Sequence, residues 1–303
     1  MLLTSEINIR DPFVYVENGV YYMTGTRGPT CWGPADGFDG YRSTDLTHWE
    51  GPFEIFHRPE GFQPDRNYWA PEIHAYQGSY YLFATFNEET RKKGTMILKA
   101  DAPLGPYVLH SEGRITPGEW DCLDGTFYLS PEQVPYMVFC HEWQDAVEGH
   151  GHLGDGTVCA VQLSEDLRHP VGEPRVLFAA SQAQPWIRSI EHPRYPGPNY
   201  ITDGPFLYRT SDGTLVMLWS SFGEHGYVEA VARSDNGDVT GNWRIDETPL
   251  FAENGGHGML FTTTEGQLTL VLHSPNTHLE ERPVFIPIDE SRLICRTARS
   301  TCC

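Results

Sequence analysis

One pattern occurs five times along the chain, and it constrains the fold more than any other feature of the sequence. Each copy has an alternating apolar run rich in Val, Ile, Tyr, Phe and Trp, then a tight turn, then a second apolar run. Four of these turns carry residue pairs typical of β-hairpins, at positions 18–19, 77–78, 212–213 and 265–266. The repeat therefore predicts a series of β-hairpins, because no segment shows sustained helical periodicity with caps.

A second half follows the hairpin in most copies. The segments 42–52, 99–107, 163–174 and 233–243 each contain a turn rich in Ser, Asp, Gly and Pro, with room for a strand on either side. Four strands in each of five units predict an all-β fold, a single five-bladed β-propeller domain over residues 1–303 with four antiparallel strands per blade. We expect the blades to start near residues 9, 69, 123, 201 and 255.

The charge of the chain limits its partners. With 21 Lys and Arg against 41 Asp and Glu, the net charge is −20, which repels nucleic acid and anionic membrane surfaces. Residues 1–6 lack the basic start and apolar core of a secretory signal, so a cytoplasmic location is expected. The seven cysteines, at 31, 122, 140, 159, 295, 302 and 303, are scattered and predict free, mostly buried thiols. Nothing in the sequence indicates an oligomeric state.

The geometry of a propeller brings the starts of the blades together. The first strand of each blade lines the central channel, so the opening residues of all five blades converge at one rim. In this chain the predicted openers are Asp11, Glu72, Asp124, Asp203 and His257. Each Asp could instead cap a turn, His257 could be an ordinary core histidine, and the Trp-Ala-Pro-Glu setting of Glu72 favours a structural role that bonds backbone amides between blades.

Several acids that face one cavity cannot all ionise freely, because like charges raise one another's pKa. One acid can then stay protonated while another is ionised, which is the division of labour that cleavage of a glycosidic bond requires. Five aromatic residues could offer apolar faces to sugar rings: Trp32, Tyr68, Trp69, Trp143 and Trp186. Trp69 could equally belong to the core between blades.

Five short segments carry a resemblance to a known family. They are Asn-Ile-Arg-Asp-Pro at 8–12, Trp-Ala-Pro-Glu at 69–72, Leu-Asp-Gly-Thr-Phe at 123–127, Asp-Gly-Pro at 203–205 and Gly-His-Gly at 256–258. In order and spacing, the chain resembles family 43 glycoside hydrolases over nearly its whole length. The resemblance implies an inverting glycosidase for arabinose- or xylose-containing glycosides. We expect an exo-acting enzyme similar to α-L-arabinofuranosidases or β-xylosidases.

The resemblance also implies roles for individual residues. Asp11 matches the general base, and Asp124 matches the acid that orients the proton donor and tunes its pKa. Asp203 stands where the family usually has a Glu as general acid, so Glu142 is an alternative donor, with Glu191 and Glu224 as further options. An inverting pair of carboxyl groups is expected about 6.5–9.5 Å apart.

Other matches concern substrate and metal. Trp32, Trp69 and Trp143 are predicted to contact substrate, and Arg282 matches an arginine that contacts substrate hydroxyls in the family. His257 matches a channel histidine that in many members touches a hydrated Ca²⁺, although calcium prefers several oxygen ligands. The expected partner is an oligosaccharide or a small glycoside.

Two other functions stay open at this point. A non-catalytic carbohydrate-binding propeller is compatible with the missing Glu at the acid position. A five-bladed fructan-cleaving hydrolase shares the Arg-Asp-Pro element at 10–12, although its other usual motifs are absent. The Pro-rich segment 181–200 is predicted to form a lip that narrows the pocket toward terminal sugars, or else an ordinary surface loop. The G-x-G-x-x-G pattern at 149–154 is not interpreted as a dinucleotide site, because no helix is expected after it.

Overall fold

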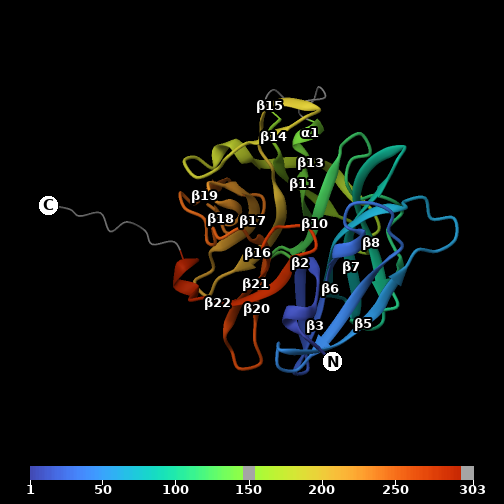
Figure 1. Ribbon diagram of the computed structural model, residues 1–303. Helices are drawn as coiled ribbons and strands as arrows, with labels where there is room; N and C mark the ends of the chain where they lie inside the picture. The colour runs from blue at the N-terminus through green and yellow to red at the C-terminus, as the bar shows by residue number, and fades with distance from the viewer. Residues whose placement is uncertain (146–153, 295–303) are drawn as a thin grey trace.

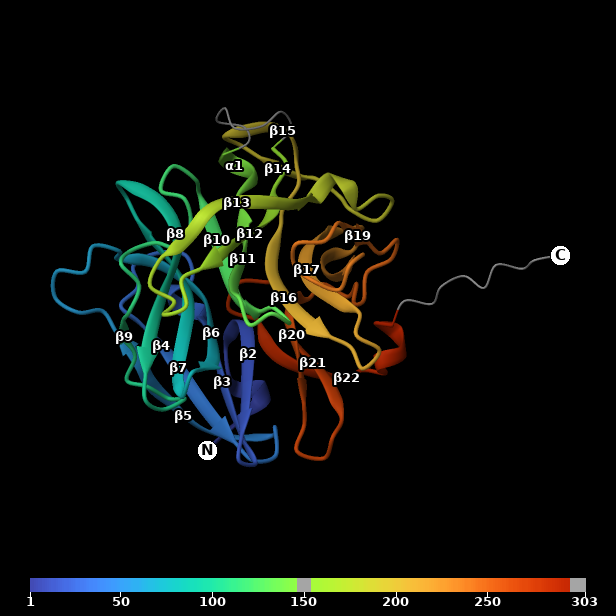
Figure 2. The ribbon, with the colours of Figure 1, turned by 180° about the vertical axis from the view of Figure 1, so that it is seen from behind.

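The computed structural model describes residues 1–145 and 154–294, and β-strands make up nearly all of its regular structure. Five antiparallel sheets stand around a common axis, as Figures 1 and 2 show from opposite sides. The predicted five-bladed β-propeller is confirmed. No helix in these described ranges is long and apolar enough to cross a membrane.

The blades follow one another in sequence, and each begins with its innermost strand. Blade I contains β2 (Ile9–Glu17), β3 (Val20–Arg27), β4 (Gly37–Ser43) and β5 (His48–His57), and β1 (Leu2–Leu3) pairs with β5. Blade II contains β6 (Arg66–Tyr76), β7 (Ser79–Glu88), β8 (Arg91–Ala100) and β9 (Val108–Leu109). Blade III contains β10 (Cys122–Leu129), β11 (Pro135–His141), β12 (Thr157–Leu163) and β13 (Pro170–Ala179).

The last two blades and the connecting pieces complete the ring. Blade IV contains β16 (Asp203–Arg209), β17 (Leu215–Gly223), β18 (Gly226–Ser234) and β19 (Trp243–Ile245). Blade V has three strands in the described part of the chain, β20 (Gly256–Thr262), β21 (Leu268–Ser274) and β22 (Arg282–Pro287). The remaining elements are the hairpin β14 (Ile190–His192) and β15 (Tyr195–Asn199), the turn α1 (Trp143–Asp145), and the 3₁₀ turns η1 (Thr4–Glu6), η2 (Gly28–Thr30), η4 (Ala180–Gln182) and η5 (Glu290–Arg292).

The predicted hairpin turns form as their residues require. Asn18 and Gly19 join β2 to β3 with φ values of 52° and 79°, and Gln77 and Gly78 join β6 to β7 with 47° and 77°. Two consecutive residues with positive φ make a type I′ turn, whose twist matches that of the flanking strands. Local sequence therefore determines where these inner hairpins turn.

Apolar side chains fill the spaces between neighbouring blades, with one buried cluster at each of the five interfaces. Phe38 and Leu82 belong to the cluster between blades I and II, and Phe83 and Met137 to the next. The clusters between blades III and IV, IV and V, and V and I are built in the same way. Each Å² of apolar surface that is buried at these interfaces contributes about 25 cal/mol of stabilisation to the packing of the blades.

A β-bulge occurs at the start of every blade, and it corrects two of the predicted openers. The register between the first and second strand shifts there, and the residue just inside the shift has a positive φ between 43° and 56°. These equivalent residues are Asp11, Ala70, Asp124, Gly204 and His257. The predicted opener Glu72 lies two residues after the equivalent residue Ala70, because β6 carries a further register shift between Arg66 and Trp69. The predicted opener Asp203 lies one residue before the equivalent residue Gly204.

Side chains from the preceding blade hold these bulges. The backbone N–H groups of Ala70, Asp124 and His257 donate to the hydroxyl oxygens of Thr26 (2.8 Å), Thr85 (2.9 Å) and Ser220 (2.7 Å). The N–H of Asp11 donates to Nδ1 of His273 at 3.1 Å. Each acceptor lies near the end of the second strand of its own blade. Four of the five blade starts are thus fixed by a side chain from the second strand of the blade before them.

Blades V and I form separate sheets, so side chains rather than a shared strand connect the two ends of the ring. The Arg10 guanidinium forms a 2.8 Å ion pair with Glu281, whose side chain is fully buried. Asn8 donates to the Glu281 carbonyl (3.0 Å), and Arg282 donates to the carbonyl of Ser5 (2.9 Å). These contacts join segments more than 260 residues apart and place Asp11 at this seam.

The cysteines of the described chain behave as expected. Cys31, Cys122, Cys140 and Cys159 are buried and free. Cys295, Cys302 and Cys303 lie outside the described residues, as does most of the glycine-rich pattern at 149–154.

Candidate active site

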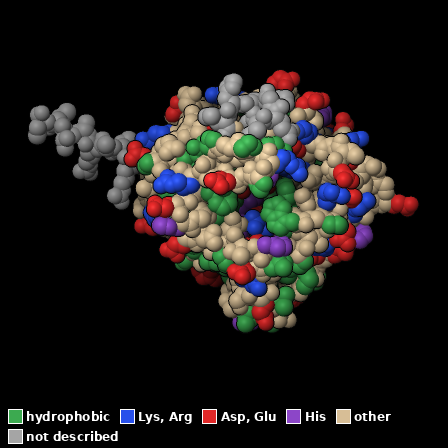
Figure 3. All heavy atoms as spheres, turned by 45° about the horizontal axis from the view of Figure 1, so that its top comes forward, with side chains coloured by type: hydrophobic (Ala, Val, Ile, Leu, Met, Phe, Trp, Pro, Cys, Tyr) green, Lys and Arg blue, Asp and Glu red, His purple; other side chains and the backbone are tan. Residues whose placement is uncertain are grey.

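A cavity of about 210 Å³ opens where the inner strands begin, on the upper side of the molecule in Figure 1. Figure 3 looks toward this face, which is hollowed near its centre. Eight of the candidate site residues predicted from the sequence line the cavity: Asp11, Asp124, Asp203, Glu142, Trp32, Trp69, Trp143 and His257. The convergence of the blade starts is therefore observed.

Asp11 is surrounded by positive charge and hydrogen-bond donors. Its carboxylate accepts a 2.6 Å hydrogen bond from the Thr26 hydroxyl and lies 3.2 Å from Nδ1 of His257. Burial opposes ionisation, but His257 and Arg10 outweigh it and hold the pKa of Asp11 below its usual value. Asp11 is therefore an ionised carboxylate at neutral pH, as a general base must be.

Asp124 occupies the equivalent bulge in blade III and behaves in the opposite way. It is 2 % exposed, and the backbone N–H of Gly204 donates to its Oδ2 at 3.1 Å. Burial raises the pKa of Asp124 to about 8, and the charges of Asp203 and Asp11 act in the same direction. This acid retains its proton under conditions in which Asp11 is ionised.

Asp203 begins β16 and is half-buried at the cavity wall. The Tyr227 hydroxyl donates to its Oδ2 at 2.9 Å. Burial, together with the charges of Glu142 and Asp11, raises the pKa of Asp203 to about 6. A raised pKa next to an ionised base is the arrangement that acid–base hydrolysis uses.

His257 lies between the acids. Burial disfavours a charge on its ring, but Asp11, Asp124 and Asp203 together raise its pKa to about 9, so it is an imidazolium at neutral pH. The close approach of this ring also explains Gly204, because a Cβ there would lie 2.6 Å from the imidazole and the φ of Gly204 is +53°.

The donor set around His257 suits a calcium ion poorly. Its Nδ1 faces Asp11 and Asp124, and the described residues contain no group of three or more His, Cys, Asp and Glu side chains placed to hold a metal. Calcium takes 6–8 oxygen ligands, most of which would have to be water here. The calcium site stays a prediction, and no chemical step below depends on it.

Glu142, the alternative donor, forms a 3.0 Å ion pair with the buried Lys93. Asp203 has no such cationic partner among the described ion pairs, and this difference favours Asp203 over Glu142 as the proton donor. Glu191 is exposed on β14 and Glu224 pairs with Arg188, and neither lines the cavity.

The predicted aromatic residues divide into wall and core. Trp32 is 60 % exposed and meets Trp69 edge to face, with Arg10 lying over the ring of Trp32. Trp143 is 4 % exposed, because His192 and Tyr195 of the β14–β15 hairpin pack against it. Tyr68 and Trp186 are core residues instead: Tyr68 packs on Phe86, and Trp186 on Trp219. A flat ring at the open mouth is therefore supplied by Trp32.

Arg282 and Arg10 differ from the sequence-based assignment. Arg282 lies outside the cavity lining, and its guanidinium donates to the carbonyls of Ser5, Leu279 and Glu281. The predicted substrate contact of Arg282 stays a prediction that this geometry does not favour. Arg10 lines the cavity and is the arginine available to a bound sugar.

Sequence reasoning missed several residues that tune the site. Lys93 pairs with Glu142 and Tyr227 donates to Asp203, and the positions of these two residues follow only from the three-dimensional pairing of the strands. The exception is Arg10, which the Arg-Asp-Pro motif could have revealed because it adjoins Asp11. Glu229 is also fully buried nearby, where it accepts hydrogen bonds from Ser220 (3.0 Å) and Gly258 (2.7 Å).

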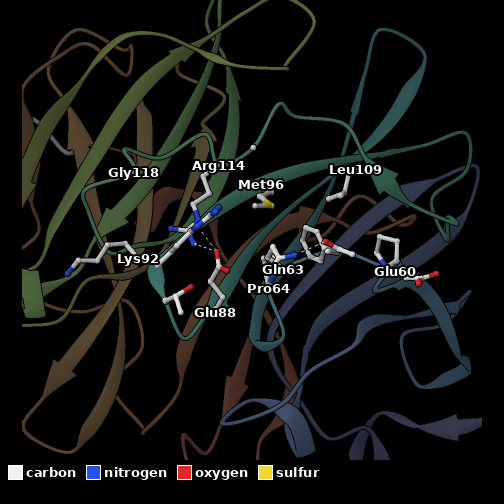
Figure 4. A pocket seen from close by; sticks show the side chains of 15 residues that line it. Glu60, Gln63, Pro64, Glu88, Lys92, Met96, Leu109, Arg114 and Gly118 are labelled. Atoms are coloured by element: carbon white, nitrogen blue, oxygen red, sulfur yellow. Dashed lines mark hydrogen bonds and ion pairs between the residues drawn. The ribbon is translucent and has the colours of Figure 1, made fainter.

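A second cavity, of about 780 Å³, lies beside blade II and is shown in Figure 4. Two consecutive residues of β8 line different cavities: Lys93 lines the one that contains Asp11, and Lys92 lines the larger one. The charged groups in its wall include Arg114 and Glu88, which pair with each other at 3.1 Å. This larger cavity has no cluster of carboxyl groups comparable to the one around His257.

Comparisons with known proteins agree with this geometry. A family profile described as glycosyl hydrolases family 43 matches residues 4–302. The structure of an endo-arabinase from Bacteroides thetaiotaomicron is 36 % identical in sequence and superposes with a TM-score of 0.86. The match covers 95 % of this chain and 97 % of the endo-arabinase chain. An endo-1,4-β-xylanase from the same organism is 20 % identical over 93 % of this chain and 91 % of the xylanase chain, with a TM-score of 0.72. An α-L-arabinofuranosidase from Lactobacillus brevis is 17 % identical over 93 % of this chain and 91 % of the arabinofuranosidase chain, with a TM-score of 0.70. Both show a shared fold. The chain is a glycoside hydrolase and belongs to family 43.

Proposed function

We propose that the enzyme hydrolyses α-L-arabinofuranosyl linkages with inversion, removing arabinose from the ends of short arabinose-containing oligosaccharides. The observation that carries the chemistry is the opposite protonation of acids in one cavity: the pKa of Asp11 is lowered, and those of Asp203 and Asp124 are raised to about 6 and about 8. The choice of arabinose is supported by the 36 % identity to a protein described as an endo-arabinase.

In this mechanism Asp11 accepts a proton from water as the water oxygen bonds to the anomeric carbon. The bond from that carbon to the leaving oxygen breaks, and Asp203 donates its proton to the leaving oxygen. Asp124 accepts the N–H of Gly204, the residue after Asp203, and so orients the donor. The imidazolium of His257 favours the ionised form of Asp11 throughout.

The size and walls of the cavity support attack at chain ends. Its volume of about 210 Å³ is below the roughly 300–1,000 Å³ of pockets for drug-sized ligands, which suits one sugar ring. Ile190 of the β14–β15 hairpin forms part of the wall, which supports the proposal that the segment 181–200 acts as a lip. The exposed Trp32 then offers a stacking surface to the next sugar.

An endo-acting enzyme is the second candidate, because the relative with 36 % identity is described as an endo-arabinase. Linear α-1,5-arabino-oligosaccharides separate the two modes. An exo-acting enzyme releases only arabinose at early times, whereas an endo-acting enzyme releases a mixture of shorter oligosaccharides. Shortening the hairpin between Ile190 and Asn199, which pair across it, should shift the products toward the mixture.

The acid and base roles are tested with Asp11→Asn and Asp203→Asn against the exposed control Glu191→Gln. The substrates are 4-nitrophenyl α-L-arabinofuranoside, the corresponding β-D-xyloside, and arabinotriose. We expect both Asp variants to lose turnover while the control retains it, and proton NMR to show the β-anomer of arabinose as the first product. Full activity of Asp203→Asn would move the donor to Glu142, and a first α-anomer would exclude inversion.

A further inference from the structure

Blade III departs from the construction that fixes the other blade starts. In blades I, II, IV and V, an oxygen or nitrogen of Thr26, Thr85, Ser220 or His273 accepts the N–H of the following blade's bulge. The strand pairing places Cys140 at the corresponding position in blade III, opposite Leu123. A thiol is a weak acceptor, and burial raises the pKa of Cys140 well above its usual value, so it stays a neutral thiol.

In blade IV the N–H at the bulge belongs to Gly204, and Asp124 rather than Cys140 accepts it. Gly204 donates to Oδ2 of Asp124 at 3.1 Å. Because Gly204 follows Asp203 directly, this bond ties the side chain of Asp124 to the backbone that carries Asp203. The two acids with raised pKa values are therefore connected through one hydrogen bond.

Blade I shows what a hydroxyl does at this position. Thr26 accepts the N–H of Ala70 and also donates to the Asp11 carboxylate, so the hydroxyl lies between the carboxylate and the next blade. In blade III no hydroxyl intervenes, and the carboxyl group of Asp124 meets the next blade directly. The identity of one side chain thus decides whether the channel acid bonds to a hydroxyl or to a backbone amide.

We propose that Cys140 is a positioning residue whose lack of a hydroxyl leaves the Gly204 N–H to Asp124 and so fixes Asp203 relative to Asp124. This inference rests on the proposed roles of Asp124 and Asp203. Cys140 is fully buried and does not line the cavity, so it acts through Gly204 rather than on the substrate. The same geometry predicts that Ser at position 140 would capture the Gly204 N–H, as Thr26 captures that of Ala70.

The test compares Cys140→Ser with Cys140→Ala. The Ser variant is nearly isosteric but adds an acceptor, whereas the Ala variant removes volume and adds none. We expect Cys140→Ser to lower kcat on arabinotriose by about tenfold, equivalent to one hydrogen bond, with KM within about twofold of wild type because the cavity wall is unchanged. Cys140→Ala should retain more kcat than Cys140→Ser. A residue that only packs would give the reverse order, because a cavity costs more than an isosteric change.

Two controls keep the outcome decisive. Cys159→Ser buries a hydroxyl in the same blade, next to the Thr157 hydroxyl and away from Gly204, and should leave kcat unchanged. A crystal structure of Cys140→Ser should show the Gly204 nitrogen within hydrogen-bond distance of the new hydroxyl. Wild-type kcat in Cys140→Ser, or a Gly204 N–H still on Asp124, overturns the inference. If Asp203→Asn is also fully active, the donor role proposed for Asp203 fails as well and the donor moves to Glu142; if Asp203→Asn is inactive, only the role of Cys140 fails.

Discussion

Asp11 and Asp124 start equivalent strands with nearly the same backbone, φ 54° and 56°, and both are buried, yet they titrate in opposite directions. Asp11 meets the Thr26 hydroxyl, the charge of Arg10 and the closer approach of His257. Asp124 receives one backbone N–H and faces two other acids. The propeller supplies identical positions, and the neighbouring side chains decide which acid is ionised.

The sharpest way to break this comparison is to make both acids neutral in turn. Asp11→Asn removes a carboxylate that must be ionised, so we expect kcat to fall by about 10³–10⁴-fold. Asp124→Asn resembles the protonated acid that is already present, so its loss of kcat should be at least tenfold smaller. Steady-state kinetics on arabinotriose measure both, with circular dichroism to verify folding. Equal losses would contradict the assignment, and a larger loss at Asp124 would exchange the roles of the two acids.

The opposite pKa shifts of Asp11 and Asp124 should give a bell-shaped pH profile of kcat/KM, with one acidic limb and one basic limb. Asp11 must be ionised, so activity falls only when the pH drops through its pKa, below the usual value near 3.8. The pair of Asp203 and Asp124 must hold a proton, so activity falls as the pH rises through the range from about 6 to about 8. Above that range the loss should approach about tenfold per pH unit. A flat profile between pH 6 and 9 contradicts the proposed donor.

Tyr227→Phe should have a smaller effect and act on one limb. The Tyr227 hydroxyl donates to Asp203 at 2.9 Å and favours its ionised form, so removing it raises the pKa of Asp203. We expect the basic limb to move to higher pH by less than about one unit, and kcat to fall by about three- to tenfold. A pH titration of kcat/KM detects the shift. Movement of the acidic limb instead would place Tyr227 on the base.

Glu229→Gln should have the smallest effect on turnover, because this third acid with a raised pKa lies outside the cavity lining. Burial raises the pKa of Glu229 to about 8, from 4.5. The folded protein therefore binds a proton that the unfolded chain releases, and stability falls as the pH rises from about 4.5 to about 8. The Gln variant has no carboxyl group at this position and does not lose stability in this pH range. Its free energy of unfolding at pH 7 should therefore exceed that of wild type by on the order of 1 kcal/mol or more. Urea unfolding at pH 4.5 and pH 7 measures the difference, which should disappear at the lower pH.

The parts of the fold that could be predicted from sequence are those set by local chemistry. Alternating apolar residues and pairs such as Asn18-Gly19 determine strands and turns within a few residues of themselves. The openers at Glu72 and Asp203 were misplaced because a bulge shifts the register without changing the composition around it. The partnership of Arg10 with Glu281 joins positions 271 apart, and no local pattern reports it. Protonation depends on such distant neighbours, so it could be read only from the assembled ring.

The seam between the first and last blades gives this enzyme a particular way to fail. Asp11 is the base in the proposed mechanism, and its backbone N–H donates a hydrogen bond to His273 of blade V. The adjacent Arg10–Glu281 ion pair joins the same two blades. Heat that parts the two ends of the chain by a small distance would move the base away from its water while every sheet is still intact. Catalysis should therefore be lost on warming before the sheets melt.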